Sequence, residues 1–200
     1  MLPRIHPMRL RLVGKPFDHP DYIFELKHDG FRAVAYMQNG ECKLISRNLN
    51  NLRFNSLKKE LAKLPVGNAI IDGEIVCLDA QGVSQFYQLL SRKAEPVFCA
   101  FDLLWLNGED LRNQPLTARK KRLARLIRSA DCPRILYAQH IEQYGKGFFE
   151  EICSRDLEGI VAERRLSIYK DDGQGWLKIK NRTYSQAEGR HELLTRKPKP

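Results

Sequence analysis

The sequence predicts an α+β fold with mainly antiparallel sheets, and three observations predict it. Stretches with strand composition outnumber helical stretches, and the two kinds do not alternate in regular βαβ units. Asn39-Gly40 separates two segments of alternating polar and apolar residues, and Asn-Gly is a strong hairpin indicator, so residues 31–46 are predicted to form a β-hairpin. Hydrophobic residues make up 42% of the 200 residues, which is enough for a packed core.

The other elements follow from short apolar runs and from apolar residues at helical spacing. Strands are predicted over 22–26, 69–78, 97–106, 159–163 and 176–180. Helices are predicted over 56–64, with Ser56 as the N-cap, and over 117–129. The second helix is expected to turn Leu123, Leu126 and Ile127 inward. Its outer face is expected either to be solvated or to meet phosphate. That face is expected to carry six cations: Arg119, Lys120, Lys121, Arg122, Arg125 and Arg128.

The chain is predicted to have one main domain with an extension at each end. Residues 1–21 are rich in proline and basic residues and are predicted to form an extended arm packed on the domain. The main domain is predicted to span residues 22–182. Residues 183–200 are predicted to form a basic tail.

Charge and cysteine content exclude several classes of protein. The chain has 34 Lys and Arg against 24 Asp and Glu, a net charge of +10 that favours phosphate-rich partners. Five scattered cysteines without a Cys-x-x-Cys pair argue against a disulfide framework and a zinc site, and favour a reducing compartment. There is no signal-peptide pattern and no apolar run near the roughly 20 residues of a membrane span, so we expect a cytoplasmic protein without a membrane partner.

Five short elements combine reactive side chains with strands. Lys27 ends a strand just before the turn Asp29-Gly30, and acids interrupt the apolar strands that contain Glu74 and Phe101. Glu158-Gly159 precedes another strand, and in the last strand Lys178 and Lys180 share one face. Alone, each element is compatible with a surface hairpin, a strand end or an edge strand protected by lysines.

The order of the five elements resembles the nucleotidyltransferase motifs of ATP-dependent DNA ligases, RNA ligases and mRNA capping enzymes. Residues 101–127 and the opening, with Pro7-Met8 and residues 16–20, are similar to bacterial and archaeal ATP-dependent DNA ligases. The resemblance covers about residues 7–182. It implies the ligase and capping-enzyme nucleotidyltransferase fold, which is ATP-grasp-like: two antiparallel sheets with flanking helices and the nucleotide in the groove between them.

The resemblance also implies roles for individual residues. Lys27 would attack the α-phosphate of ATP and become lysyl-AMP, and Lys178 and Lys180 would neutralise that phosphate. Glu25 and Leu26 would recognise adenine, partly through backbone groups, and Phe101 would stack on it. Arg32 and Arg47 would contact the sugar or a phosphate. Glu74 and Glu158 would hold a divalent metal, Mg²⁺, with Glu74 also near the ribose.

Three departures from the family pattern leave alternatives open. Leu49 replaces a glycine after Ser46-Arg47-Asn48, and Glu163 replaces a lysine, for which Arg164 and Arg165 are expected to compensate. The sequence given also stops short of the OB-fold domain that usually follows. The expected function is nick sealing in duplex DNA. The OB-fold domain would then come from a separate OB-fold or repair partner, or from the rest of a longer chain. The alternatives are an RNA-end ligase or other AMP transferase, and a degenerate ATP- or DNA-binding module without turnover.

Overall fold

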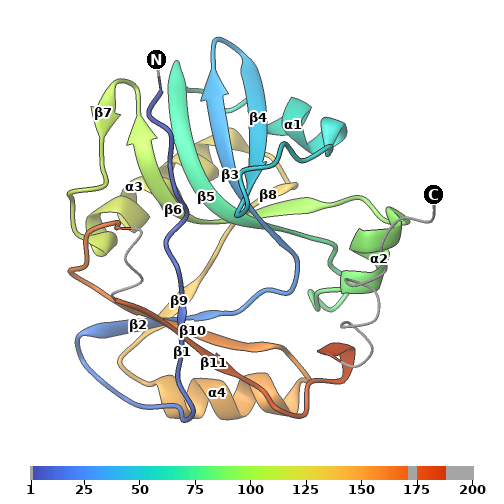
Figure 1. Cartoon of the computed structure of the whole chain (residues 1–200), viewed down its shortest axis with the longest axis vertical. Coiled ribbons are helices and arrows are strands. Elements are labelled where there is room, and N and C mark those ends of the chain that lie inside the picture. Colours follow the sequence, from blue (N-terminus) through green and yellow to red (C-terminus); the bar gives the residue numbers. More distant parts are fainter. Residues whose placement is uncertain (1, 171–174, 188–200) are drawn as a thin grey trace.

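Two β-sheets form the framework of the computed structural model, which describes residues 2–170 and 175–187 (Figure 1). The strands of the first sheet lie in the order β1-β11-β10-β2-β9. Those of the second lie in the order β4-β3-β5-β6-β7, and β8 also pairs with β6. All of these pairings are antiparallel except β1 with β11 and β6 with β8. The predicted α+β class with mainly antiparallel sheets is confirmed.

The elements have the following bounds. The first sheet consists of β1 (Arg11–Leu12), β2 (Tyr22–Leu26), β9 (His140–Glu142), β10 (Gly159–Arg164) and β11 (Trp176–Lys180). The second consists of β3 (Phe31–Gln38), β4 (Glu41–Ser46), β5 (Asn68–Val76), β6 (Val97–Leu106), β7 (Glu109–Asp110) and β8 (Ile135–Tyr137). The helices are α1 (Asn55–Leu61), α2 (Phe86–Ser91), α3 (Leu116–Ala130), α4 (Gly145–Ser154) and the 3₁₀ turn η1 (Ser185–Ala187).

The predicted hairpin is present as β3 and β4. Asn39 and Gly40 have φ angles of 54° and 73°. Both values are positive, as the tight turns that match the twist of two strands require. The local sequence was therefore sufficient to specify this turn.

Helix boundaries agree less well with the prediction. Helix α1 begins at Asn55 and ends at Leu61, so the predicted extension to residue 64 is wrong. Its N-cap position is Phe54, and no side chain caps it. The Ser56 hydroxyl instead accepts a hydrogen bond from Arg134 Nη2 at 3.2 Å. Helices α2 and α4 were not predicted.

The N-terminal arm lies along both sheets (Figure 1). Ile5 and Met8 are buried. The Ile5 amide donates to the Tyr36 hydroxyl at 2.8 Å, and the Met8 amide donates to the Tyr169 hydroxyl at 3.0 Å. At the other end of the chain, residues 183–187 continue from β11 into η1, and the predicted basic tail from residue 188 onward lies outside the described residues.

Helices cover the outer faces of the sheets and leave their inner faces for a site. Helix α3 packs against β6 and β8, α1 against β4, and α4 against β10 and β2. A separate apolar cluster joins the two sheets, with Ile23 from β2, Val34 from β3 and Trp176 from β11. Within the two described ranges, no helix is long and apolar enough to cross a membrane.

Candidate active site

A cavity of about 490 Å³ collects side chains from both sheets. That volume is within the usual range for a small-molecule site. Nine of the ten predicted site residues line it: Glu25, Leu26, Lys27, Arg32, Arg47, Glu74, Phe101, Glu158 and Lys178. The tenth, Lys180, does not line the cavity and is exposed at the end of β11.

Lys27 and Glu158 form an ion pair inside this cavity, with Nζ and Oε2 2.6 Å apart. The sheet register explains their proximity. Because β2 and β10 are antiparallel and Leu26 pairs with Ile160, Lys27 comes opposite Gly159, the neighbour of Glu158 in the chain. The Lys27 amide extends this ladder by donating to the Gly159 carbonyl at 2.9 Å. The two side chains are 21% and 10% exposed, so each can reach a ligand.

Two glycines allow the chain to approach closely here. Gly30 follows the Lys27 turn, and a Cβ at this position would collide with the Ile75 carbonyl oxygen. Gly159 has a φ of 142°, and a Cβ there would collide with the Ile179 carbonyl oxygen. Each glycine therefore lets one strand end lie against its neighbour, which brings the side chains beside it into the cavity.

Lys178 adds a second cation to the Lys27 end of the cavity. It pairs with Val161 across β10 and β11, and Val161 pairs in turn with Glu25 on β2, so all three share one sheet face. Burial lowers the pKa of Lys178, and the positive charges of Lys180 and Lys27 lower it further. Lys180 therefore affects the cavity electrostatically.

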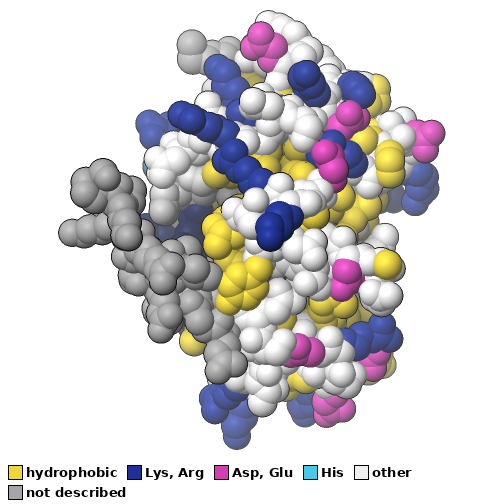
Figure 2. Space-filling view, turned by 90° about the vertical axis from the view of Figure 1, so that its right-hand side faces the viewer, with side chains coloured by type: hydrophobic (Ala, Val, Ile, Leu, Met, Phe, Trp, Pro, Cys, Tyr) yellow, Lys and Arg dark blue, Asp and Glu magenta, His cyan; other side chains and the backbone are white. Residues whose placement is uncertain are grey.

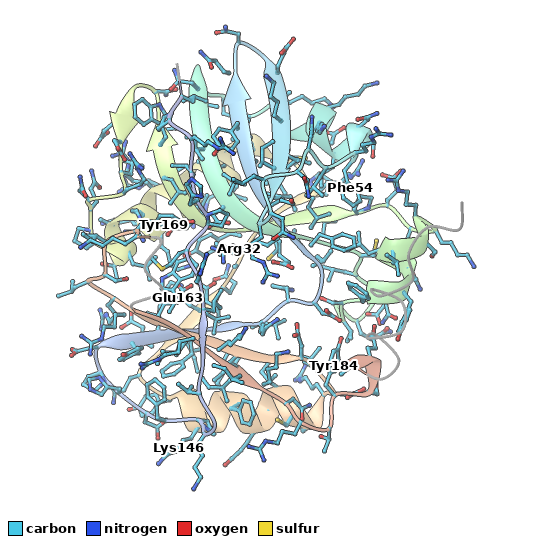
Figure 3. All side chains as sticks on the ribbon, in the orientation of Figure 1. Arg32, Phe54, Lys146, Glu163, Tyr169 and Tyr184 are labelled. Carbon is cyan, nitrogen blue, oxygen red and sulfur yellow. The ribbon has the colours of Figure 1, made fainter. Side chains whose placement is uncertain are left out.

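Arg32 has its guanidinium anchored in the cavity wall. Its Nε and Nη2 donate to the Asp72 carboxylate at 3.1 and 2.7 Å, and its Nη1 donates to the Met8 carbonyl at 2.6 Å. The Tyr169 hydroxyl also donates to Asp72, at 2.6 Å. Arg32 thus ties the arm to β5, in addition to lining the cavity between the sheets (Figure 3).

Aromatic rings lie at the same wall. The Arg32 guanidinium carbon is 5.3 Å from the centroid of the Phe101 ring and 5.5 Å from that of Trp176. Phe101 and Trp176 meet edge to face, with centroids 5.8 Å apart. Both rings line the cavity, but Trp176 is only 1% exposed, so the half-buried Phe101 offers the flat apolar surface that a nucleobase stacks on.

Glu25 and Glu163 share one buried cation, Lys120 from α3. Lys120 Nζ contacts Glu25 Oε1, lies 4.0 Å from Glu163 Oε2 and donates to the Phe101 carbonyl at 2.8 Å. Burial raises the pKa of Glu25 to about 7 against the opposing effect of Lys120. Burial, and then the charge of Glu25, raise the pKa of Glu163 well above its usual value.

The expected compensation of Glu163 by Arg164 and Arg165 is wrong. Arg164 Nε donates to the Tyr22 hydroxyl at 2.9 Å, and Arg165 Nη1 pairs with Glu142 at 3.1 Å. Arg164 lies on the opposite face of β10 from Glu163, because side chains alternate along a strand. The compensating cation is Lys120, which comes from another element.

The expectation that six cations lie on the outer face of α3 is also wrong for two of them. Arg119 and Lys120 are fully buried. Arg119 Nε and Nη2 each lie 2.8 Å from a carboxylate oxygen of Asp102. Both positions fall between Leu116 and Leu123 at helical spacing, so the apolar periodicity of the helix could have revealed that they face inward.

Glu74 and Glu158 are the predicted metal ligands. Both line the cavity, and burial raises the pKa of Glu74 to about 8, with the negative charge of Glu158 adding to the rise. Within the described ranges, no group of three His, Cys, Asp or Glu side chains could hold a metal by itself. Mg²⁺ usually takes one or two carboxylates together with substrate phosphates and water. Two carboxylates beside a cationic pocket fit that mode of binding.

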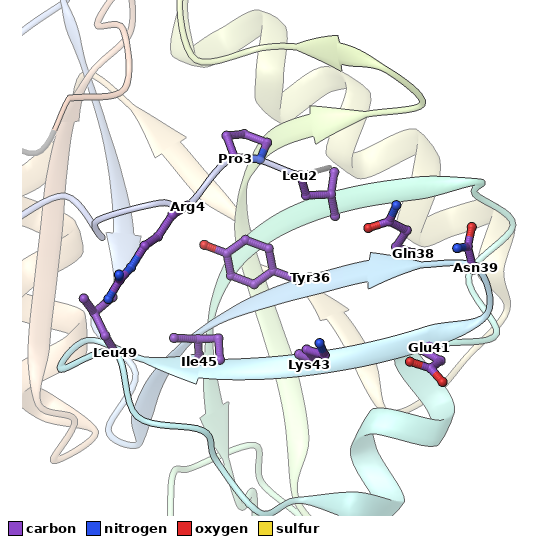
Figure 4. A pocket seen from close by; sticks show the side chains of 10 residues that line it. All are labelled: Leu2, Pro3, Arg4, Tyr36, Gln38, Asn39, Glu41, Lys43, Ile45 and Leu49. Carbon is purple, nitrogen blue, oxygen red and sulfur yellow. The ribbon is translucent and has the colours of Figure 1, made fainter.

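A larger cavity of about 640 Å³ lies elsewhere, between the arm and the face of the β3–β4 hairpin that carries Tyr36 and Ile45 (Figure 4). Leu2, Pro3 and Arg4 form one side, and Tyr36 and Ile45 belong to the hairpin. It contains none of the predicted site residues, so volume alone does not identify the reactive cavity.

The fold agrees with the comparisons to known proteins. The family described as ATP dependent DNA ligase domain matches residues 9–180, and the chain belongs to this family. It is 29% identical over 191 residues to the SPbeta prophage-derived DNA ligase-like protein LigB of Bacillus subtilis, an alignment that covers 91% of this chain and 69% of that protein. It is 30% identical to the multifunctional non-homologous end joining protein LigD of Pseudomonas aeruginosa, over 88% of this chain.

Solved structures give the same result. The ligase domain of M. tuberculosis LigD superposes with a TM-score of 0.75 at 26% identity, covering 87% of this chain and 59% of that chain. A mycobacterial DNA ligase D complexed with ATP and MES gives a TM-score of 0.73 at 26% identity, over 86% of this chain and 60% of that chain. The chain spans only 22% of the Pseudomonas LigD and 30% of an archaeal DNA ligase from Pyrobaculum neutrophilum.

Proposed function

We propose that this chain is the self-adenylating part of a DNA ligase, with Lys27 as its nucleophile. Lys27 Nζ would form a bond to the α-phosphorus of ATP while the bond from that phosphorus to the bridging oxygen of pyrophosphate breaks. The lysyl-AMP would then pass its AMP to the 5′-phosphate of a DNA nick, and the 3′-hydroxyl would displace AMP. The supporting observation is the position of Lys27 in a cavity that Lys178, Arg32 and the Phe101 ring also line.

The polarity of the cavity suggests how ATP would lie in it. The base would occupy the end with Phe101, Trp176 and Glu25, and the α-phosphate would lie near Lys27 and Lys178. An amine attacks only in its neutral form, so the Lys27 proton must leave before the bond forms. A fixed cation such as Lys178 would stabilise the extra charge on the phosphate in the transition state.

Glu74 and Glu158 would hold Mg²⁺ together with the phosphates of ATP. When bound, the ion would neutralise charge on the departing pyrophosphate. In the structure Glu158 pairs with Lys27. The same carboxylate could therefore hold the lysine in place before ATP binds.

Nicked duplex DNA is the proposed acceptor of AMP. The net charge of +10 favours a polyanionic partner. Lysine and arginine side chains lie along much of the upper part of one face, beside a hydrophobic area (Figure 2). An OB-fold domain, in a longer chain or in a separate repair partner, would help to hold the duplex.

Intact-mass spectrometry would test the first step. The wild type should gain one AMP when incubated with ATP and Mg²⁺, and Lys27→Ala should gain none. Lys146→Ala is the matched control, because Lys146 is an exposed lysine on α4 outside the cavity (Figure 3). An adduct on Lys27→Ala would overturn the assignment of the nucleophile.

Nick sealing should then be measured with paired DNA and RNA nicks. Preferential sealing of the DNA nick would support the proposed acceptor. Preferential sealing of RNA would favour the RNA-end alternative. ATP binding without any adduct would indicate a binding module without turnover.

A further inference from the structure

The Oε2 atom of Glu163 is buried at the base end of the cavity, and no described residue donates a hydrogen bond to it. The side chain is 2% exposed and lines the cavity. Among the described residues, no hydrogen-bond donor reaches its buried Oε2 atom. A buried acceptor without a donor is destabilising, so this atom needs a partner, which a bound ligand or an ordered water can supply.

Lys120 does not fill this role. Its ammonium group contacts Glu25 and donates to the Phe101 carbonyl at 2.8 Å, whereas Glu163 Oε2 is 4.0 Å away, beyond hydrogen-bond distance. Lys120 therefore provides electrostatic attraction that keeps two acids together in one buried place. The hydrogen-bonding capacity of Glu163 remains available.

The register of the first sheet places the Glu163 carboxylate beside the aromatic wall of the cavity. Glu163 on β10 pairs with Trp176 on β11, and Val161, two residues earlier, pairs with Glu25 on β2. Residues two apart on a strand share one face, so Val161 and Glu163 both face the cavity. Lys120 also binds the main chain of Phe101, which brings the acid pair close to that residue.

We infer that Glu163 is a specificity-determining residue of the nucleotide site and accepts a hydrogen bond from the exocyclic amino group of a 6-aminopurine. This inference rests on the proposed binding of ATP in the same cavity. An amino group supplies the missing donor. The carbonyl at the same position of guanine or hypoxanthine would place an acceptor against two acids.

Glu25 and Glu163 together can form hydrogen bonds to both the amino group and the neighbouring ring nitrogen of adenine. They share one cation and repel each other, and burial raises the pKa of both groups. A proton retained by the pair would give one donor next to one acceptor. Adenine presents the complement, an amino donor beside a ring-nitrogen acceptor. The replacement of the family's lysine by Glu163 would therefore alter how the base is bound.

The test compares two ligands that differ in one group. ATP and purine riboside 5′-triphosphate, which lacks only the 6-amino group, are titrated against wild type and Glu163→Leu, and both affinity and Lys27 adenylation are measured. Wild type should prefer ATP by about 10-fold or more, as the loss of a hydrogen bond to a charged group predicts. In Glu163→Leu the ratio of the affinity for ATP to the affinity for the analogue should fall toward one.

The ratio of the two affinities separates recognition from folding. A structural defect in Glu163→Leu would weaken both ligands equally and leave the preference unchanged, which would overturn the inference. Glu163→Gln keeps an acceptor and should retain most of the preference for ATP. Glu142→Gln, an acid outside the cavity, is the matched control and should behave as wild type.

The outcomes also separate this inference from the proposed function. If neither nucleotide binds the wild type, the proposed function fails and the inference fails with it. If ATP labels Lys27 but the Glu163→Leu preference equals that of wild type, the proposed function stands and only the inference is overturned.

Discussion

Lys27 Nζ lies 2.6 Å from Glu158 Oε2, and this contact joins the end of β2 to the start of β10. The pair brings together the proposed nucleophile and a proposed metal ligand, although 131 positions separate them in the chain. It also keeps the lysine directed into the cavity before any nucleotide binds.

Replacing Glu158 by glutamine should impair adenylation far more than folding. Glu158→Gln keeps the shape of the side chain but removes its charge, so Mg²⁺ and Lys27 both lose a partner. We expect the rate of lysyl-AMP formation to fall by about 100-fold, the usual effect of losing one positioned group. Time-resolved intact-mass spectrometry would measure it, with Glu142→Gln as the control. An unchanged rate would remove Glu158 from the reaction.

The buried pair of Arg119 and Asp102 should be essential for stability. Asp102→Asn would leave the Arg119 charge in the core without its counter-ion, so we expect the free energy of unfolding to fall by about 3–5 kcal/mol. Urea unfolding would measure the loss. The control is Glu109→Gln, which breaks the more exposed pair with Arg122 at 2.8 Å and should change the midpoint little. Equal effects of the two variants would contradict this interpretation of the core.

Leu49 occupies a backbone conformation that favours glycine. Its φ is 63°, so the departure from the family's glycine retains the left-handed backbone. A side chain in that region costs about 1 kcal/mol. Leu49→Gly should therefore stabilise the protein by about that amount in urea unfolding. Leu49→Ala removes most of the same side chain but keeps its Cβ, so it should give no gain. A gain in both variants would point to side-chain packing as the cause.

Glu74 should make stability depend on pH. Burial raises its folded-state pKa to about 8 from an ordinary value of 4.5, so the folded state retains a proton that the unfolded chain releases. The resulting stabilisation is complete below about pH 4.5 and is lost as the pH rises to about 8. Without nucleotide, the difference in unfolding free energy between wild type and Glu74→Gln should decline across this window by at most about 1.4 kcal/mol per pH unit. A flat difference curve would contradict the shift.

Local patterns in the sequence determined much of the framework. The sequence predicted the Asn39-Gly40 turn and the exact bounds of strands β2, β6 and β11. Backbone preferences and side-chain alternation specify these features, and both act over a few neighbouring positions. The order of the motifs identified nine side chains that the fold brings into one cavity. The turn and the strand bounds were confirmed because they depend on local chemistry. The nine side chains meet in one cavity, and their individual roles stay predictions.

Only the tertiary structure decided which charged residues pair. From the sequence, Arg119 and Lys120 were assigned to an exposed face, and Arg164 and Arg165 were expected to balance Glu163. In the fold, α3 packs against β6, so Arg119 reaches Asp102, and Lys120 reaches Glu25 and approaches Glu163. Buried charges must find counter-ions wherever packing provides them, because desolvation is costly. Such partners lie far apart in the chain, and a local pattern cannot specify the distance that separates them in space.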